Sequence, residues 1–167
     1  MSDRSLPWAV CWDEHVPALI LLARQWSDCH ADAEDIVQEA FLHFWAKGDS
    51  VRDPVAYLYG CVRRAAMDRF RQKHRRQEQT TAGIGAAEEP WFETDGFCPE
   101  EQEGRAEIER ALGKLSLDQR QVVVMKIWGG LTFAAIGEVL AISANTAASR
   151  YRLALAALRN HLDEDVI

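Results

Sequence analysis

Residues 32–76 combine an acidic half and a basic half, and each half carries apolar residues at helical spacing. The acidic half opens Asp-Ala-Glu-Asp-Ile-Val-Gln-Glu at residues 32–39, and the basic half ends Arg-Phe-Arg-Gln-Lys-His-Arg-Arg at residues 69–76. Apolar positions three and four residues apart predict amphipathic helices. One compact unit would then present a negative helix and a positive helix, which is typical of a protein that binds a basic partner and an anionic polymer together.

Charge is strongly segregated along the 167-residue chain. The net charge is −7, yet residues 54–79 carry +5 and residues 110–167 carry +2, while residues 1–53 carry −6 and residues 80–109 carry −8. Binding of a polyanion depends on the local potential within a Debye length of about 10 Å. Despite the negative total, the two basic segments are therefore compatible with DNA binding at two places.

The cysteines favour a cytoplasmic protein with reduced thiols. They are Cys11, Cys29, Cys61 and Cys98, and no two of them form a Cys-x-x-Cys pair. Because no second close pair accompanies Cys29-His30, we expect no metal site and no cofactor. The apolar run at residues 19–23 is too short to span a bilayer, and residues 1–4 lack the pattern of a signal peptide.

Three helices can be placed in the N-terminal half from apolar spacing and from helix-terminal residues. The first covers residues 8–27, and Pro17 should start its regular part or kink it, because proline donates no amide hydrogen bond. Asp32 is the expected N-cap of the second helix. Pro54 stands in the first turn of the third, after a loop at residues 48–53.

The same spacing predicts which side chains these helices bury. The second helix should bury Ile36, Val37, Ala40, Phe41, Phe44 and Trp45, and the third should bury Val55, Leu58, Tyr59, Val62, Ala66 and Phe70. The third should expose Arg63, Arg64, Arg71, Lys73, Arg75 and Arg76. Tyr57 and Tyr59 lie near its start, and cations beside aromatic rings suit single-stranded nucleic acid. The alternative is that both tyrosines are ordinary residues at the edge of the core.

Repeated glycines and prolines interrupt the helical pattern over residues 77–104, together with a cluster of carboxylates. This composition predicts a flexible acidic linker. Trp91, Phe92 and Phe97 are unusual in a spacer, and they can either dock on a partner or fold back on the chain. The predicted fold is therefore all-α, with two small helical domains at residues 1–78 and 105–167 and a linker at residues 79–104.

Residues 105–158 return to helical spacing and end in a helix-turn-helix pattern. The spacing of Ile108, Leu112 and Leu115 predicts one helix. A second helix should contain Val122, Val123, Met125, Ile127 and Trp128 and end at Gly129-Gly130. Thr132 can cap a short helix, Gly137 is small where the next helix must cross closely, and Ser143 follows a tight turn and can cap that helix. The last helix should turn inward Ala147, Tyr151, Leu155 and Leu158. In such units the second helix enters the major groove by its polar N-terminal end, although a generic helical hairpin is the alternative.

These segments, taken together, resemble a known family. Residues 32–41 are similar to the acidic polymerase-binding segment of sigma region two, and residues 54–76 are similar to its −10 recognition helix. Residues 115–158 resemble sigma region four, which recognises the −35 element. Two such domains with a variable linker and no region three are the layout of extracytoplasmic-function (group IV) RNA polymerase sigma factors. The resemblance covers nearly the whole chain.

The resemblance implies a dissociable subunit that directs bacterial core RNA polymerase to specific promoters and promotes DNA opening without ATP. The residues that would bind the coiled coil of the largest polymerase subunit are Asp32, Asp35, Gln38 and Glu39. Those that would hold the −10 element, including an unstacked base, are Asp49, Ser50, Arg52, Tyr57, Arg63, Arg64 and Arg71. Those that would meet the −35 duplex are Asn145, Thr146, Ser149, Arg150 and Arg152. An anti-sigma factor is a typical partner, and a free member usually packs its two domains together to hide its DNA surfaces.

Some residues depart from the family's pattern. Arg64 stands where the family often has asparagine, and residues 145–148 replace the commoner Gly-Thr-Val-basic start of the recognition helix. Leu153 and Leu155 replace frequent basic residues. Because region four then has fewer cations to place on phosphate, we expect weaker or shape-dependent −35 contacts.

Two other functions are compatible with parts of the pattern. A two-domain helix-turn-helix regulator would bind duplex DNA as a dimer without polymerase, but it has no need of the acidic helix or of the linker. A sigma-like interaction protein would bind polymerase or an anti-sigma factor without opening promoters. An enzyme is the least supported reading, because no nucleophile or partner histidine accompanies the carboxylates, and no catalytic residue is predicted.

Overall fold

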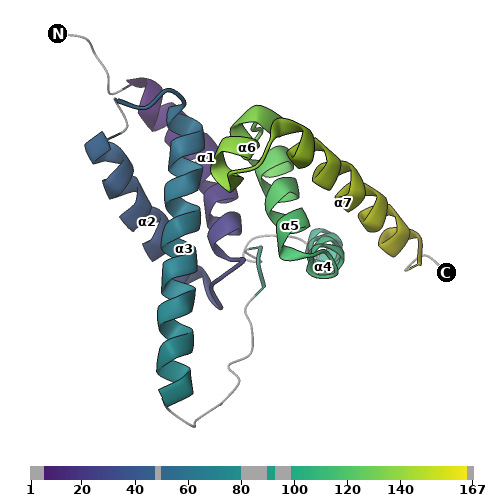
Figure 1. Ribbon diagram of the computed structural model, residues 1–167. Helices are drawn as coiled ribbons and strands as arrows, with labels where there is room; N and C mark the ends of the chain where they lie inside the picture. Colours follow the sequence, from purple (N-terminus) through teal and green to yellow (C-terminus); the bar gives the residue numbers. More distant parts are fainter. Residues whose placement is uncertain (1–5, 48–49, 80–89, 93–98, 165–167) are drawn as a thin grey trace.

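The computed structural model describes residues 6–47, 50–79, 90–92 and 99–164. All regular structure in these ranges is helical, which confirms the all-α prediction (Figure 1). The elements in chain order are α1 (Leu6–Ala23), α2 (His30–Lys47), α3 (Pro54–Gln79), α4 (Pro99–Gly113), α5 (Leu117–Val123), the π-helical turn η2 (Val124–Trp128), α6 (Phe133–Leu140) and α7 (Ala144–Glu164). Figure 1 shows α1–α3 on one side of the molecule and α4–α7 on the other, and α6 contacts α3. Within the described ranges, no helix combines the length and the hydropathy that a bilayer span requires.

Most helix ends follow the local signals that the sequence carries. α3 begins at Pro54, as predicted. The Thr132 hydroxyl accepts a hydrogen bond of 3.1 Å from the Ala135 amide at the start of α6. The Ser143 hydroxyl likewise accepts one of 3.0 Å from the Thr146 amide at the start of α7. Both predicted caps of the helix-turn-helix unit are therefore confirmed.

Two N-terminal helices begin earlier than predicted. α1 starts at Leu6 and continues through Pro17, so this proline neither starts nor ends the helix. α2 starts at His30, and Asp32 therefore lies in its first turn and is not its N-cap. The Asp32 carboxylate still benefits from the positive end of the helix dipole, which explains why an acidic residue at this position resembles a cap in the sequence.

α4 begins at Pro99, inside the segment that the sequence assigns to a linker. Proline is pre-set to a helical φ at the first position of a helix, and Glu100 and Glu101 in the first turn suit the dipole. The sequence did not predict this helix start, because the acidic residues around it are also typical of a linker. The remaining predicted linker residues, at 80–89 and 93–98, lie outside the described residues, whereas Pro90–Phe92 folds back onto the helices.

Some side chains predicted to be buried lie at the surface instead. They are Trp45, Phe70 and Leu155, which are 65%, 40% and 40% exposed. Apolar spacing shows which face of a helix is hydrophobic, but not how far a neighbouring helix covers it. Residues 71–78 of α3 are all exposed, so Phe70 stands where this helix leaves the bundle. On α7, Ala154 takes the buried position predicted for Leu155.

The two halves share one hydrophobic core. We call the surface where α1–α3 meet α5–α7 and η2 the seam. Residues of the C-terminal half that join the core cluster of α1–α3 include Val122, Val124, Met125, Leu131 and Ile136, all of which are buried. α6 contacts α3, and η2 contacts α1. The expectation that the free chain packs its two domains together is confirmed.

Tyr59 forms a close contact at the seam. It is fully buried, and its hydroxyl lies 2.8 Å from Nδ1 of His15 on α1. Burial raises the pKa of Tyr59 and lowers the pKa of His15. A Cβ on Gly129 would lie 2.8 Å from the Tyr59 hydroxyl and 2.6 Å from the carbonyl oxygen of Met125. The C-terminal half therefore requires glycine where it approaches this tyrosine.

Candidate partner and nucleic-acid interfaces

The acidic side of α2 faces solvent. Asp32, Asp35, Gln38 and Glu39, which were predicted to contact a partner, are all exposed. Asp35 and Gln38 are three residues apart and therefore project from one face of the helix. Neither has a hydrogen-bond or ion-pair partner among the residues that the structure describes. This face is open to a cationic partner.

α3 supplies positive charge along the flank of α2. Nη2 of Arg69 lies 3.3 Å from Oε2 of Glu39, and its Nη1 donates to the carbonyl oxygen of Asp32 at 3.5 Å. Lys73 forms an ion pair with Asp28, and this hydrogen bond raises the pKa of Lys73. Exposed pairs of this kind contribute roughly 0–1 kcal/mol, so they orient the side chains more than they hold the fold. Of the four residues predicted to contact a partner, Glu39 is therefore already paired within the chain, whereas Asp35 and Gln38 are unpaired among the described residues.

The loop before α3 is described in part. Asp49, which was predicted to contact the −10 element, lies outside the described residues. The Ser50 hydroxyl donates to the carbonyl oxygen of Lys47 at 2.8 Å, and Arg52 is exposed. These two residues lie at the end of α2 and beside the first turn of α3, where an extruded base could approach the loop.

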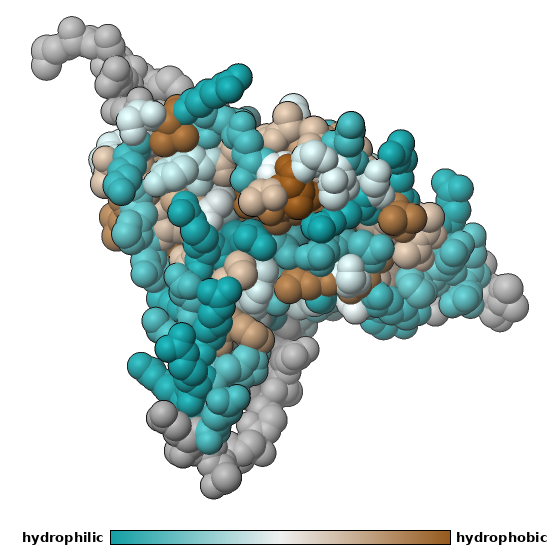
Figure 2. Space-filling view, viewed as in Figure 1, coloured by the Kyte–Doolittle hydropathy of each residue, from teal (hydrophilic) through white to brown (hydrophobic). Residues whose placement is uncertain are grey.

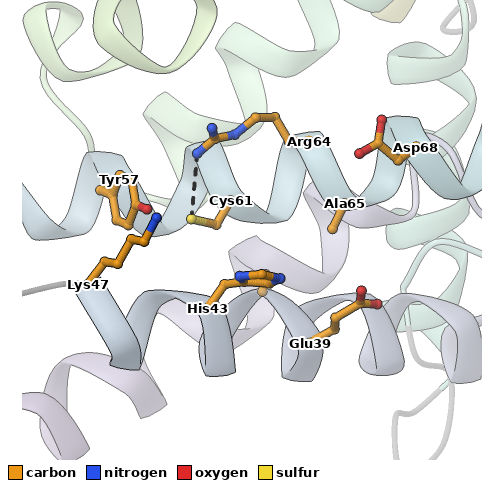
Figure 3. A pocket seen from close by; sticks show the side chains of 9 residues that line it. Glu39, His43, Lys47, Tyr57, Cys61, Arg64, Ala65 and Asp68 are labelled. Atoms are coloured by element: carbon orange, nitrogen blue, oxygen red, sulfur yellow. Dashed lines mark hydrogen bonds between the residues drawn. The ribbon is translucent and has the colours of Figure 1, made fainter.

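A pocket of about 270 Å³ opens between α2 and α3 (Figure 3). Figure 3 shows Lys47 of α2 extending toward Tyr57 of α3, while Arg64 lies along α3 with its guanidinium toward Cys61. The Arg64 guanidinium lies 5.9 Å from the centre of the Tyr57 ring, and its Nη2 is 3.7 Å from Sγ of Cys61. An aromatic ring with a guanidinium beside it suits an unstacked base and its phosphate. The structure brings Tyr57 and Arg64, two members of the predicted −10 set, to the same pocket.

A second hollow of about 360 Å³ lies between the start of α3 and α6. Tyr57 and Arg64 also line it, and its other wall is formed by Glu138 and Val139 of α6. In this closed arrangement the C-terminal half therefore stands directly beside part of the surface predicted to bind the −10 element.

Arg63 departs from its predicted exposure. It is half-buried at the seam, where its Nε donates to Oε1 of Gln121 on α5 at 2.7 Å. Desolvation lowers the pKa of Arg63, although the nearby Asp118 carboxylate acts in the opposite direction. Periodicity placed this arginine on the outer face of α3, but α5 covers that part of the face.

The C-terminal part of α3 is strongly hydrophilic. Figure 2 shows hydrophilic residues over the end of α3 that projects away from the other helices in Figure 1. The exposed cations there are Arg71, Lys73, Arg75 and Arg76. Arg71 lies 3.6 Å from Asp68, one turn earlier on the same helix. This end can approach phosphates without interference from the C-terminal half.

The start of α7 presents a polar surface. Asn145, Thr146, Ser149 and Arg152 are exposed, as predicted for a recognition helix. Nη2 of Arg152 donates to the Ser149 hydroxyl at 3.2 Å. Ala141 has a φ of 55° in the turn before this helix, and Asn145 lies two positions after the Ser143 cap. The geometry is that of a helix-turn-helix unit whose second helix begins with short polar side chains.

Arg150 is less available than the other predicted −35 residues. Its side chain is 31% exposed, and Nη2 lies 3.8 Å from Oδ2 of Asp118 on α5. Arg150 would have to leave this carboxylate to reach a phosphate. The sequence spacing could not show this, because Asp118 is distant along the chain.

One residue at these surfaces was not anticipated from the sequence. Gln121 is 1% exposed, and its amide joins Arg63 to the carbonyl oxygen of Leu117. Its available signal is a glutamine at the start of the otherwise apolar run at residues 121–125. Trp91 and Phe92, which the sequence marked as able to fold back on the chain, pack against the hydrophobic clusters. The described residues contain no cluster of three or more His, Cys, Asp or Glu side chains that could hold a metal ion.

Two known protein families match the chain, one in each half. Residues 11–76 match the sigma-70 region 2 family, and residues 105–158 match the sigma-70 region 4 family. The first match contains the acidic face of α2 and the cations of α3. The second contains the helix-turn-helix unit of α6 and α7.

Individual proteins resemble the chain over most of its length. The ECF RNA polymerase sigma factor SigL of Mycobacterium tuberculosis is 31% identical over 161 residues, covering 92% of this chain and 87% of SigL. SigK of Mycobacterium ulcerans, also an ECF RNA polymerase sigma factor, is 32% identical over 137 residues, covering 78% of this chain and 72% of SigK.

Two solved structures have a similar fold. The sigma factor RpoE of Bartonella quintana, solved with the anti-sigma factor NepR, is 24% identical with a TM-score of 0.71 and covers 98% of both chains. CnrH, solved with the cytosolic domain of CnrY, is 23% identical with a TM-score of 0.64, covering 98% of this chain and 92% of CnrH.

Proposed function

The chain belongs to the extracytoplasmic-function (ECF) family of RNA polymerase sigma factors, and from that premise we propose how its surfaces share the work of initiation. As a sigma factor it directs core polymerase to specific promoters and promotes DNA opening there. We assign residues 1–78 to core and −10 binding, residues 79–104 to a linker, and residues 105–167 to −35 binding. The observation that carries this assignment is the presence, in one chain, of an exposed acidic face on α2 and a capped helix-turn-helix unit at α6 and α7.

The acidic face of α2 is the proposed site for core polymerase. Asp35 and Gln38 are exposed and unpaired among the described residues, so a cationic helix can reach them without breaking an internal contact. Asp32 and Glu39 contribute beside them, although Glu39 must exchange Arg69 for the polymerase. Complementary charge of this kind accelerates association and fixes the orientation of the partner.

The −10 element is proposed to bind at the loop before α3 and along α3. An unstacked base would enter beside Tyr57 and Arg64, where a ring and a guanidinium already lie together. Unstacking costs a few kcal/mol, and base–aromatic stacking returns about 1–3 kcal/mol per base. The proposed set also contains Asp49, Ser50, Arg52, Arg63 and Arg71.

Promoter binding requires the two halves to separate. Arg63 is held by Gln121, and Glu138 and Val139 face the proposed −10 surface across a narrow hollow. DNA strands cannot occupy that surface while α6 stands there. We therefore assign the structure to the free, closed form, from which α5–α7 must move away before both promoter elements can be bound.

Four further assignments belong to this proposal. We propose that the chain belongs to group IV, and its matches to regions 2 and 4 support this. We propose that it has no catalytic activity of its own and that it acts in the cytoplasm, where promoters and polymerase are found. RpoE and CnrH were solved with an anti-sigma factor and with the cytosolic domain of CnrY, respectively. We propose that an anti-sigma factor binds this chain as well.

The decisive test is binding to bacterial core RNA polymerase, followed by transcription from a promoter library. We expect the purified chain to co-elute with core polymerase and to yield promoter-specific transcripts that core polymerase alone does not produce. Specific binding of duplex DNA by the chain alone, together with no retention on polymerase, would favour a self-sufficient helix-turn-helix regulator instead.

Arg152→Ala should weaken binding of the holoenzyme to promoter DNA and reduce its salt dependence. Arg152 is exposed, so its loss removes about one phosphate contact and lowers the slope of log K against log[salt] by about 1. Arg150→Ala should have the smaller effect, because Arg150 already lies beside Asp118. Fluorescence anisotropy at several salt concentrations measures both slopes. Arg110→Ala on α4 is the matched control, and a slope in Arg152→Ala equal to the wild type's would contradict the assignment of α7.

A further inference from the structure

Pro90–Phe92 crosses the seam between the two halves. Figure 1 shows this short piece beside the end of α1 and close to α4 and α5. It belongs to the segment that a sigma factor uses as a linker, yet Trp91 and Phe92 pack against both hydrophobic clusters of the molecule. A spacer has no need of such contacts.

Its first residue is bound by the N-terminal half. The carbonyl oxygen of Pro90 accepts a hydrogen bond of 3.2 Å from Nη2 of Arg24, at the end of α1. Arg24 is 2% exposed, and its other terminal nitrogen donates to the carbonyl oxygen of Ser27. A buried guanidinium is costly unless acceptors surround it. The Pro90 carbonyl oxygen is one of the acceptors that offset the cost of burying Arg24.

The second residue is bound by the C-terminal half. The Trp91 amide donates to Oε1 of Glu109 on α4 at 2.7 Å. The Arg120 guanidinium of α5 lies 5.1 Å from the centre of the Trp91 ring. Nε of Arg120 is buried without a hydrogen-bond acceptor among the described residues, and desolvation lowers its pKa. No described acceptor binds Nε of Arg120, and the face of the Trp91 ring attracts this guanidinium instead.

The third residue completes the attachment. The Phe92 ring lies 5.9 Å from the Trp128 ring of η2, and the Arg105 guanidinium of α4 lies 5.8 Å from the Phe92 ring. The segment therefore contacts Arg24, the residue that follows α1, and three elements of the C-terminal half.

We propose that Pro90–Phe92 is a strap that holds the seam closed in the free chain and leaves its site when the two halves separate. Its contacts to Arg24 and to Glu109 lie on opposite sides of the seam and cannot both persist after separation. Because the strap is covalently attached near both halves, it binds at high effective concentration, and weak contacts suffice. Its role in delaying promoter binding rests on the function proposed above, whereas its role in closing the free chain does not.

Oxidation of Met125 by hydroxyl radicals in the free, full-length chain tests the strap. Met125 is fully buried at the seam, so its oxidation rate reports the fraction of open molecules, and the partly exposed Met67 serves as an internal reference. Trp91→Ala/Phe92→Ala should raise the Met125 rate about tenfold, because a cation–π contact and an aromatic pair are lost. Glu109→Ala, which removes one hydrogen bond outside both cores, should raise it about threefold.

Glu103→Ala is the matched control, because it removes the same charge from an exposed position of the same helix. Circular dichroism identifies any variant that has unfolded. If the double variant has unfolded, Glu109→Ala alone still tests the strap. The strap proposal would be overturned if the folded Trp91→Ala/Phe92→Ala variant oxidised Met125 at the wild-type rate. It would also be overturned if Glu103→Ala raised that rate as much as Glu109→Ala does. Holoenzyme made with the strap variants should also bind promoter DNA faster. Absence of polymerase binding by the wild-type chain would overturn the proposed function and leave the oxidation result standing.

Discussion

Replacing Asp35 by arginine is expected to weaken binding to core polymerase by at least about 100-fold and to leave the fold intact. Asp35 is exposed and has no partner among the described residues, so its replacement breaks no internal contact. In the complex, the new cation would face the positive charges of the partner, and like charges across an interface cost several kcal/mol. A loss of about 2.7 kcal/mol already corresponds to 100-fold. Titration of labelled core polymerase with the variant measures this change.

Glu34→Arg provides the matched control. It makes the same change in net charge one residue away, on a different face of α2, and Glu34 is also exposed. We expect Glu34→Arg to retain most of the affinity. Unchanged affinity in Asp35→Arg would refute the assignment of α2. Equal losses in the two variants would show that polymerase responds to the overall charge and not to the predicted face.

Replacing Gly137 by alanine is expected to destabilise the protein by about 2 kcal/mol. A Cβ at this position would lie 2.6 Å from the carbonyl oxygen of Ile142 and 3.3 Å from the backbone nitrogen of Ala144. These are backbone atoms of the turn between α6 and α7, and they cannot move aside as a flexible side chain can. The turn is also fixed by a hydrogen bond of 3.0 Å from the Ile142 amide to the Gly137 carbonyl oxygen. The recognition helix should therefore be displaced, with loss of −35 binding.

Thermal unfolding followed by circular dichroism measures this effect, with an expected fall in Tm of roughly 4–8 °C for a chain of this size. Gly104→Ala is the control, because no atom lies within 4 Å of the added Cβ and the position is inside α4. Its Tm should rise slightly, since alanine favours a helix over glycine by about 1 kcal/mol. A Gly137→Ala variant as stable as the wild type would show that the turn can relax, contrary to the predicted close crossing.

Local signals predicted the helix-turn-helix unit well because they act over a few residues. Thr132 and Ser143 cap helices through their own hydroxyls, and Gly137 fits where only a hydrogen can fit. Longer-range features were harder to predict. Trp45 and Phe70 follow helical spacing, but no neighbouring helix covers them, and coverage is decided by tertiary packing.

The candidate site shows the same division. The sequence placed Tyr57 and Arg64 on one helix, and the structure shows them in contact. Arg63 was predicted to be exposed, because the pattern of α3 cannot show that Gln121, 58 positions away, lies within hydrogen-bond distance. Trp91 was recognised as unusual in a linker, but only the packed structure shows that its amide meets Glu109. The residue roles at these surfaces remain predictions.

Because the two halves share one core, the fraction of open molecules depends on residues in the interior. If one holoenzyme in ten were open, its apparent affinity for promoter DNA would be about tenfold weaker than the intrinsic affinity. A substitution at Met125 or Ile136, which are buried and belong to no proposed partner surface, would change that fraction and with it the amount of holoenzyme needed to occupy a promoter. Drift in the buried seam would then act like a change in expression level, setting how strongly this subunit's promoters are used.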